Sequence, residues 1–309
     1  MDTLLEAIDV CDVDGFCYGN YTDEEAGTGC TVIVAPEGAT GGVDVRGGAP
    51  ASRETDLLRP ENTVDKVHAV CLSGGSAFGL EAASGVAREL ESRGIGLPVG
   101  PTQVPIVCSS CIFDLAFGNP TVRPDIEAGI AAVREALDNT PTKLEQGNVG
   151  AGTGATVGKL MGPATCMKAG LGAAALTLGP IKVGAVVSVN ACGNVVDPFT
   201  GEWVAGMRAA ADSDQIVDME LAAFAAAGSM QMPLDRTNTT ISCIVTNVEL
   251  TKAQATKVSQ MAADAYAHAI RPTHTTNDGD TIYTLASGKL GAQASAAVPL
   301  DLLGMLAVR

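Results

Sequence analysis

The sequence predicts a single-domain protein of the α/β or α+β class. Short apolar, β-branched runs alternate along the chain with segments whose apolar residues recur at helical spacing, as expected for interleaved strands and helices. The 309 residues fit one large layered domain, and no internal repeat, low-complexity tract or linker divides them. Hydrophobic residues make up 46% of the chain but aromatic residues only 4%, and 36 residues are glycine, so we expect a core of closely packed small side chains.

Five runs have the composition of buried strands. They are rich in β-branched and other apolar residues and are bounded by glycine or polar turn residues. The predicted strands cover residues 31–34, 68–72, 183–192, 240–248 and 281–285. Gly193 and Asn194 follow the third of them and are expected to turn the chain in the manner of a hairpin.

Four segments show the spacing or composition of helices. The predicted helices cover residues 76–94, 124–137, 215–227 and 251–270. Ser76 is well placed to cap the first helix. Pro124, Asp125 and Glu127 favour the amino-terminal turn of the second, and Pro272 stops the last. A loop at residues 228–236 precedes the fourth strand, and a break in this loop would interrupt no regular element.

Charge and composition exclude several classes of partner. The net charge of −16 argues against nucleic acid and anionic membranes, which require clustered basic residues. The longest apolar stretch, residues 169–181, is shorter than the roughly 20 residues that a membrane span needs. The nine cysteines are an odd number without a secretory signal, so we expect reduced thiols in a cytoplasmic protein. Cys108 and Cys111 have redox spacing, but core packing is the favoured interpretation.

Several motifs are candidates for binding or catalytic sites. The glycine-rich segment 150–159 lacks the residues of a nucleotide-binding loop, but its backbone and Lys159 could border a polar pocket. His68, His268 and His274 have no metal-ligand spacing, and we assign them no catalytic role. Without a histidine base, a Ser-His-Asp triad is disfavoured, and we expect neither a metal nor an organic cofactor.

Thr239 is the strongest candidate nucleophile. A threonine hydroxyl needs a base, and its own α-amine can serve only if threonine is the first residue of a chain. A self-inflicted cut between Asn238 and Thr239 would produce that arrangement. The local sequence Asn238-Thr239-Thr240 is also compatible with an ordinary turn that leads into a strand, and the residues alone leave both interpretations open.

Three further polar residues could serve such a nucleophile. Asp278 and Asp280 could form a plain surface turn. If the segment is extended, however, both carboxylates point to the same face and could orient an N-terminal amine. Asn190 lies at the end of a predicted strand, where it could form a turn or donate its amide to an oxyanion.

The ordered motifs of the chain resemble those of the L-aminopeptidase/D-esterase family, the DmpA-like peptidases, which includes the nylon-oligomer hydrolases. The resemblance extends from about Gly47 to Gly288. It is carried by Gly47-Gly48-Ala49-Pro50, Arg53-Glu54-Thr55-Asp56, Leu72-Ser73-Gly74-Gly75-Ser76-Ala77-Phe78-Gly79-Leu80, Gly147-Asn148-Val149-Gly150-Ala151-Gly152-Thr153-Gly154-Ala155, Val189-Asn190 with Asp197-Pro198, and Asn238-Thr239-Thr240-Ile241.

The resemblance implies a four-layer αββα sandwich and a precursor that cuts itself. The implied cut lies between Asn238 and Thr239 and yields chains 1–238 and 239–309, which assemble into a homo-oligomer, commonly a tetramer. Thr239 matches the nucleophile of the family.

The same resemblance suggests roles for four other residues. Asn190 matches the asparagine on the oxyanion side, and Lys159 matches a lysine of the nylon-oligomer branch. Asp278 and Asp280 match a pair that is Asp and Asp in that branch, which places the chain closer to it than to the aminopeptidase members. Some members also contribute a tyrosine from the segment 111–118, where this chain has only phenylalanines, Phe113 and Phe117.

The expected activity is hydrolysis of amide or ester bonds in small substrates through an acyl-enzyme. Aminoacyl amides and ω-amino acid oligomers are examples of such substrates. Two alternatives remain at this level: an acyltransferase of the ornithine acetyltransferase type, and an inactive oligomeric binding protein with the same fold.

Overall fold

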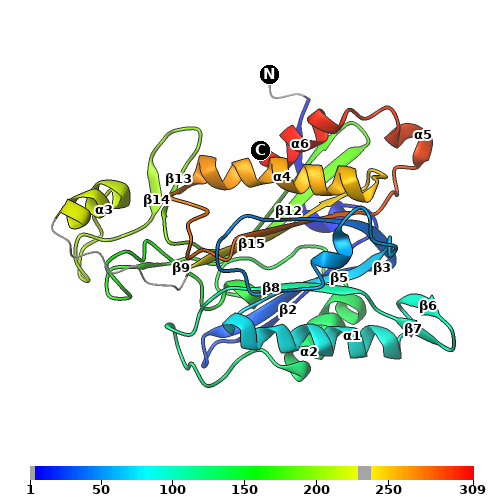
Figure 1. Cartoon of the computed structure of the whole chain (residues 1–309), viewed down its shortest axis with the longest axis horizontal. Coiled ribbons are helices and arrows are strands. Elements are labelled where there is room, and N and C mark those ends of the chain that lie inside the picture. The colour runs from blue at the N-terminus through cyan, green and yellow to red at the C-terminus, as the bar shows by residue number, and fades with distance from the viewer. Residues whose placement is uncertain (1–3, 229–237) are drawn as a thin grey trace.

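One long strand, β3 (Thr28–Val45), belongs to both halves of the main sheet (Figure 1). The structure, a computed structural model, describes residues 4–228 and 238–309. The first part of β3 pairs with β2 (Cys17–Asp23) and β5 (Val67–Ser73), and its last part pairs with β17 (Thr281–Ala286). An irregularity between Val34 and Ala39 separates the two parts, so that a single strand connects the two halves.

The described residues form a ten-stranded sheet. From edge to edge the order is β1 (Glu6–Ile8), β11 (Leu171–Leu178), β12 (Ile181–Asn190), β15 (Thr239–Thr246), β17, β3, β5, β8 (Val107–Cys111) and β4 (Ser52–Arg53), with β2 paired to β3 off this path. The pairs β15–β17 and β5–β8 are parallel, whereas the other neighbours are antiparallel.

Alternation along the strands creates the layers. In β15, Ile241 and Cys243 belong to an apolar core that also holds Val70 and Leu72 of β5, whereas Ile244 belongs to a second core with α4 (Lys252–Ala269). The first core therefore lies between the two halves of the sheet.

Helices cover the two outer faces of the sheet. Helices α4 and α6 (Leu300–Val308) pack on one side, and α1 (Ala82–Ser92) and α2 (Ile126–Arg134) pack on the other (Figure 1). This arrangement confirms the expected four-layer αββα sandwich. Within the described residues, no helix combines the length and the apolar character needed to cross a membrane.

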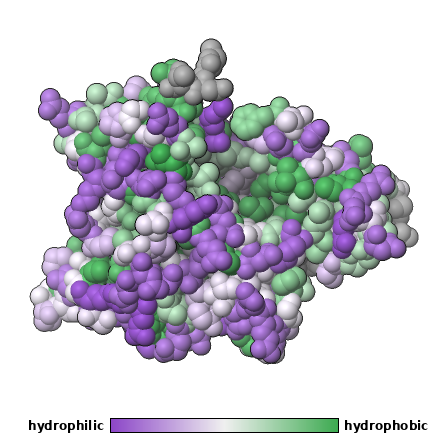
Figure 2. Space-filling view, turned by 180° about the vertical axis from the view of Figure 1, so that it is seen from behind, coloured by the Kyte–Doolittle hydropathy of each residue, from purple (hydrophilic) through white to green (hydrophobic). Residues whose placement is uncertain are grey.

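Residues 194–228 form an extension at one end of the molecule, with α3 at its tip (Figure 1). The smaller elements of the whole fold are β6 (Leu97–Val99), β7 (Thr102–Val104), β9 (Thr156–Val157), β10 (Met167–Lys168), β13 (Asn194–Val196), β14 (Trp203–Ala205), β16 (Ile270–Arg271), α3 (Met219–Gly228) and α5 (Ala292–Ser295). Seen from behind, hydrophobic side chains gather in a hollow of the surface beside this extension (Figure 2).

The predicted strands and helices are all present, with shifted ends. Two local expectations are wrong. No hairpin follows β12, because its hairpin partner is the preceding strand β11, and β13 pairs with β14 and β16 instead. Ser76 is not the cap of a helix: Gly75, with φ of 82°, holds the cap position, and Ser76 begins a 3-10 helix without a capping side-chain bond. Cys108 and Cys111 are buried free thiols in β8, as the core-packing interpretation predicted.

Candidate active site

Thr239 and Asn190 face each other across two neighbouring strands. Thr239 is the first residue of β15 and pairs with Asn190, the last residue of β12. Alternation places both side chains on the side of the first core, between the two halves of the sheet. Both are buried, with exposed fractions of 4% for Thr239 and 0% for Asn190. The Thr239 hydroxyl donates a hydrogen bond to the carbonyl oxygen of Asn238. The predicted nucleophile therefore lies against the peptide bond that the predicted cut would break.

The segment that carries Asp278 runs beside this peptide bond. Asn238 and Asp278 form a parallel bridge, and the N–H of Gly279 donates to the carbonyl oxygen of Asn238 at 3.0 Å. Gly279 also makes room for the nucleophile, because a Cβ atom at this position would lie 2.8 Å from the Thr239 hydroxyl oxygen. The Asn238 carbonyl oxygen thus accepts one bond from the nucleophile and one from a backbone amide.

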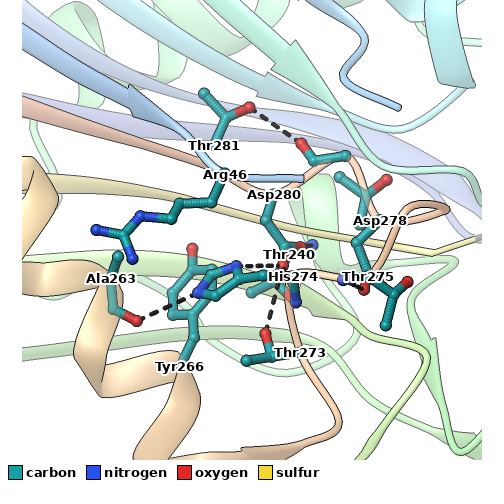
Figure 3. A network of polar contacts seen from close by, with 12 residues as sticks. Arg46, Thr240, Ala263, Tyr266, Thr273, His274, Thr275, Asp278, Asp280 and Thr281 are labelled. Atoms are coloured by element: carbon teal, nitrogen blue, oxygen red, sulfur yellow. Dashed lines mark hydrogen bonds and ion pairs between the residues drawn. The ribbon is translucent and has the colours of Figure 1, made fainter. Parts of the chain in front are cut away.

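The side chain of Asp280 binds the backbone at the start of β15. Its Oδ1 accepts the N–H of Thr240 at 2.7 Å, and its Oδ2 accepts the ring Nδ1–H of His274 at 2.8 Å (Figure 3). Ile282, two residues later, belongs to the core on the α4 side. Asp280 therefore faces α4, on the opposite side of the sheet from the Thr239 side chain.

Asp278 lies beside Asp280 and is equally buried, with 1% of its surface exposed. Its Oδ2 accepts the N–H of Thr275 at 2.7 Å. Burial raises the pKa of Asp278, and the neighbouring charge of Asp280 raises it further. The two carboxylates predicted from the sequence are thus brought together, and of the two it is Asp280 that contacts the Thr239–Thr240 backbone.

Lys159 fixes the side chain of Asn190. Its ammonium group lies 2.6 Å from Oδ1 and 3.0 Å from the carbonyl oxygen of Asn190. The N–H of Thr156 also donates to Oδ1, at 3.1 Å, and Nδ2 donates to the carbonyl oxygen of Phe113 at 3.0 Å. These bonds determine the orientation of the Asn190 amide.

The charge of Lys159 is finely balanced near neutral pH. Burial lowers its pKa to about 7, although nearby Cys166, Cys192, Asp278 and Asp114 act in the opposite direction. A lysine in this state can be charged or neutral at the pH of the cell.

A pocket of about 220 Å³ opens beside Lys159. Its lining is mostly apolar, with a few polar groups: Phe113, Asp114, Ala116, Phe117, Gly118, Gly154, Thr156, Lys159, Gly162, Pro163 and Cys166. The glycine-rich segment and Lys159 do border a pocket, as the sequence indicated, but its lining is mostly apolar and not polar as expected. Phe113 and Phe117, the two phenylalanines of the segment 111–118, line it.

Two residues near the site were missed in the sequence. Asp114 is a buried carboxylate whose oxygens accept the Thr28 hydroxyl and the Gly75 N–H, both at 2.7 Å, and burial raises its pKa. A single acidic residue within the apolar run 106–117 was the available signal. His274, to which the sequence assigned no catalytic role, contacts the buried carboxylate of Asp280. Its position four residues before Asp278 was the only clue.

The other two histidines lie elsewhere. The ring of His68 accepts the N–H of Ile106 at 3.2 Å, and His268 is exposed on α4. Across residues 4–228 and 238–309, no group of three or more His, Cys, Asp or Glu side chains is arranged to hold a metal ion.

Comparison with known proteins places this site in context. The model of peptidase family S58 matches residues 9–306. An uncharacterized aminopeptidase of Mycobacterium leprae is 41% identical over 306 residues, which cover 94% of this chain and 82% of the relative. A 6-aminohexanoate-oligomer endohydrolase of Paenarthrobacter ureafaciens is 34% identical over 284 residues, which cover 90% of this chain and 75% of that protein.

Solved structures share the fold. The L-aminopeptidase D-Ala-esterase/amidase of Ochrobactrum anthropi, described as a variant of the Ntn hydrolase fold, superposes with a TM-score of 0.64 at 16% identity, over 90% of this chain and 74% of that one. A β-aminopeptidase of Burkholderia sp. gives 0.63 at 18% identity, over 97% and 82%.

Proposed function

Because this chain belongs to peptidase family S58 and is a hydrolase of peptide or related amide bonds, we propose that its nucleophile is the Thr239 hydroxyl, released by self-cleavage. The cut falls between Asn238 and Thr239 and leaves chains 1–238 and 239–309. The observation that carries this proposal is the hydrogen bond from the Thr239 hydroxyl to the Asn238 carbonyl oxygen inside a buried strand pair.

Self-cleavage proceeds by an acyl shift. The hydroxyl oxygen of Thr239 attacks the carbonyl carbon of Asn238, the C–N bond breaks, and the hydroxyl proton ends on the departing nitrogen, which becomes the α-amine of Thr239. Water then hydrolyses the ester. The Gly279 N–H, already 3.0 Å from the Asn238 carbonyl oxygen, supports this step because it donates where negative charge develops.

Turnover uses the new α-amine as the general base. Its unperturbed pKa of about 7.7–8.0 suits proton transfer near neutral pH. It accepts the hydroxyl proton as Thr239 attacks the substrate carbonyl, and it returns that proton to the leaving amine. The acyl-enzyme then reacts with water. The amide of Asn190, directly opposite Thr239, is assigned to the oxyanion side, where Lys159 holds it.

The carboxylates of Asp278 and Asp280 position the nucleophile. Asp280 fixes the N–H of Thr240, the residue that follows the new chain end. Asp278 lies next to it and shares its buried surroundings, so the pair places negative charge near the α-amine of Thr239.

The substrates proposed are small. The pocket beside Lys159 has about 220 Å³ and a mostly apolar lining, which suits one short acyl unit. The relatives are named an aminopeptidase and a 6-aminohexanoate-oligomer endohydrolase, so N-terminal aminoacyl amides and ω-amino acid oligomers are the proposed classes.

We further propose that the cut protein is a cytoplasmic homotetramer. The exposed side chains of Phe199, Val204, Leu221 and Phe224 support an oligomer, because a second protomer would cover this apolar surface.

The test combines processing and turnover. Intact mass under denaturing conditions is expected to give two fragments that divide before Thr239, and a panel of aminoacyl p-nitroanilides and esters is expected to show hydrolysis. An uncut chain that hydrolyses these amides would contradict the proposal. An added amine acceptor separates hydrolysis from acyl transfer, because a transferase makes the acylated amine in preference to the free acid.

A further inference from the structure

Asp280 is a buried carboxylate that connects two parts of the chain. Its Oδ1 accepts the N–H of Thr240 at 2.7 Å. Its Oδ2 accepts three donors from the turn before it: the N–H of His274 at 3.1 Å, the ring Nδ1–H of His274 at 2.8 Å and the hydroxyl of Thr273 at 3.3 Å (Figure 3). The rotamer of Asp280 therefore depends on His274 at one oxygen and determines the position of the Thr240 N–H at the other.

The ring of His274 is held between two acceptors. Its Nδ1 faces the Asp280 carboxylate, and its Nε2 faces the carbonyl oxygen of Ala263 in α4 at 3.4 Å. A neutral imidazole has only one N–H, whereas the imidazolium donates from both nitrogens. The ring also stacks on Tyr266, with centroids 5.6 Å apart and an angle of 20° between the planes. This geometry favours the protonated ring.

The surrounding charges agree with that assignment. Burial alone would lower the pKa of His274, but the hydrogen bond and charge of Asp280 outweigh it and raise the pKa. Asp278 is a second buried carboxylate close to Asp280. From the other side, the Arg46 guanidinium opposes protonation, but it is bonded to Asp44 and to the carbonyl oxygen of Gln260. The hydroxyl of Tyr266 donates to Ser242 and is neutral, since burial raises its pKa.

We propose that His274 is a positioning residue for the Thr239 nucleophile. As an imidazolium it balances the charge of the Asp278–Asp280 pair and holds Asp280 on the Thr240 N–H. That bond holds the backbone of Thr240, the residue directly after the chain end that self-cleavage would create. The inference rests on the proposed function, in which Thr239 is the nucleophile.

The test uses His274→Ala and His274→Asn with His268→Gln as the matched control, because His268 is exposed on α4. Each variant is purified as the full chain, its cutting is followed by intact mass, and its kcat and KM are measured across pH. His274→Ala is expected to lower kcat about 10-fold or more, because the hydrogen bond to the buried Asp280 carboxylate is lost. KM is expected to change little, because His274 does not contact the substrate.

The pH profile separates positioning from mere structural support. Wild-type kcat is expected to fall at alkaline pH as His274 loses its proton. In His274→Asn the part of this fall that belongs to His274 disappears, because an amide donor does not titrate, whereas the part that Lys159 contributes through Asn190 remains. Asparagine also accepts the left-handed backbone found here, with φ of 55°, and is expected to recover part of the rate. His268→Gln is expected to match the wild type throughout.

Two results overturn the inference. The first is a His274→Ala variant with wild-type kcat and an unchanged pH profile. The second applies where His274→Ala does not fold: the inference then fails if His274→Asn is cut and its kcat follows the wild-type pH profile without change. A wild-type chain that is neither cut nor active overturns the proposed function instead, and the role of His274 with it.

Discussion

Asn190 and Thr239 lie directly opposite each other at the ends of β12 and β15, and the amide of Asn190 is held in place by Lys159 and by the carbonyl oxygen of Phe113. The backbones of the pair are positioned by regular sheet geometry, and loop residues Lys159 and Phe113 orient the Asn190 amide. Rigid strands place a side chain more accurately than loops do, so substitutions here are expected to separate chemistry from folding.

Replacing Thr239 is expected to abolish self-cleavage. Thr239→Ala removes the attacking oxygen, so the purified chain remains at full length and inactive. Thr239→Ser keeps a hydroxyl and is expected to be cut. The neighbouring Thr240→Val is the matched control, because the Thr240 hydroxyl has no hydrogen-bond partner among the described residues. Denaturing mass spectrometry checks all three, and a cut Thr239→Ala chain would contradict the assignment.

Asn190→Ala is expected to lower kcat by roughly 10²–10³-fold, the usual cost of losing one oxyanion donor. Ser188→Ala is the control on the same strand and face. Its hydroxyl donates to the Ala151 carbonyl oxygen at 2.7 Å, so its loss costs about 1 kcal/mol of stability but leaves the chemistry intact. Initial rates and thermal unfolding of both variants separate the two effects. Equal losses of kcat would show that Asn190 acts only through packing.

Gly279→Ala is expected to block both cleavage and turnover. The added methyl group would lie 2.8 Å from the Thr239 hydroxyl oxygen and 3.0 Å from the Ala49 carbonyl oxygen, so the nucleophile must move. Gly172→Ala on β11 offers the comparison, since a Cβ atom there meets nothing within 4 Å. Both variants are assayed for cutting and activity. Normal processing of Gly279→Ala would contradict the placement of the Thr239 side chain.

Lys159 is expected to make stability depend on pH. Its folded pKa of about 7 is below the ordinary value of 10.5, so the unfolded chain binds more protons between these two values. The free energy of unfolding therefore rises with pH across this window. Below pH about 7 the buried ammonium is charged, and the folded state bears the full free-energy cost of its burial. Lys159→Met is expected to remove this dependence, whereas Lys143→Met, at an exposed position, keeps it.

Urea unfolding at pH 7 and pH 9 measures this effect. All chains carry Thr239→Ala, so that each remains uncut. The background chain is expected to gain stability relative to Lys159→Met as the pH rises. Parallel behaviour of the two chains would refute the burial of a titrating ammonium.

Local patterns identified the elements but not their neighbours. The β-branched run at 240–248 and the capping residue Thr251 of α4 are visible in the sequence because they depend on nearby residues alone. The pairing of β15 with β12 and β17 joins residues far apart in the chain, and no local signal specifies it. The four-layer arrangement came from the resemblance of the motifs and not from periodicity.

The same limit applies to the site. Alternation predicted that Asp278 and Asp280 would lie together, but their side of the sheet depends on the register against β15, which the sequence does not show. Sequence reasoning therefore could not tell that Asp280 reaches the backbone of Thr240 instead of the Thr239 side chain. His274 was missed because its contact requires a left-handed turn residue that no motif marks.

The place of β15 and β17 between β12 and β3 has a consequence for a cut before Thr239. Both flanking strands would belong to the larger fragment. Main-chain hydrogen bonds would therefore hold the smaller fragment on two sides. The break would alter connectivity without altering shape. The two polypeptides would travel as one particle in native separation and come apart only in denaturant. Neither fragment could be replaced by adding a fresh copy to the folded enzyme, so each molecule would make its own nucleophile once.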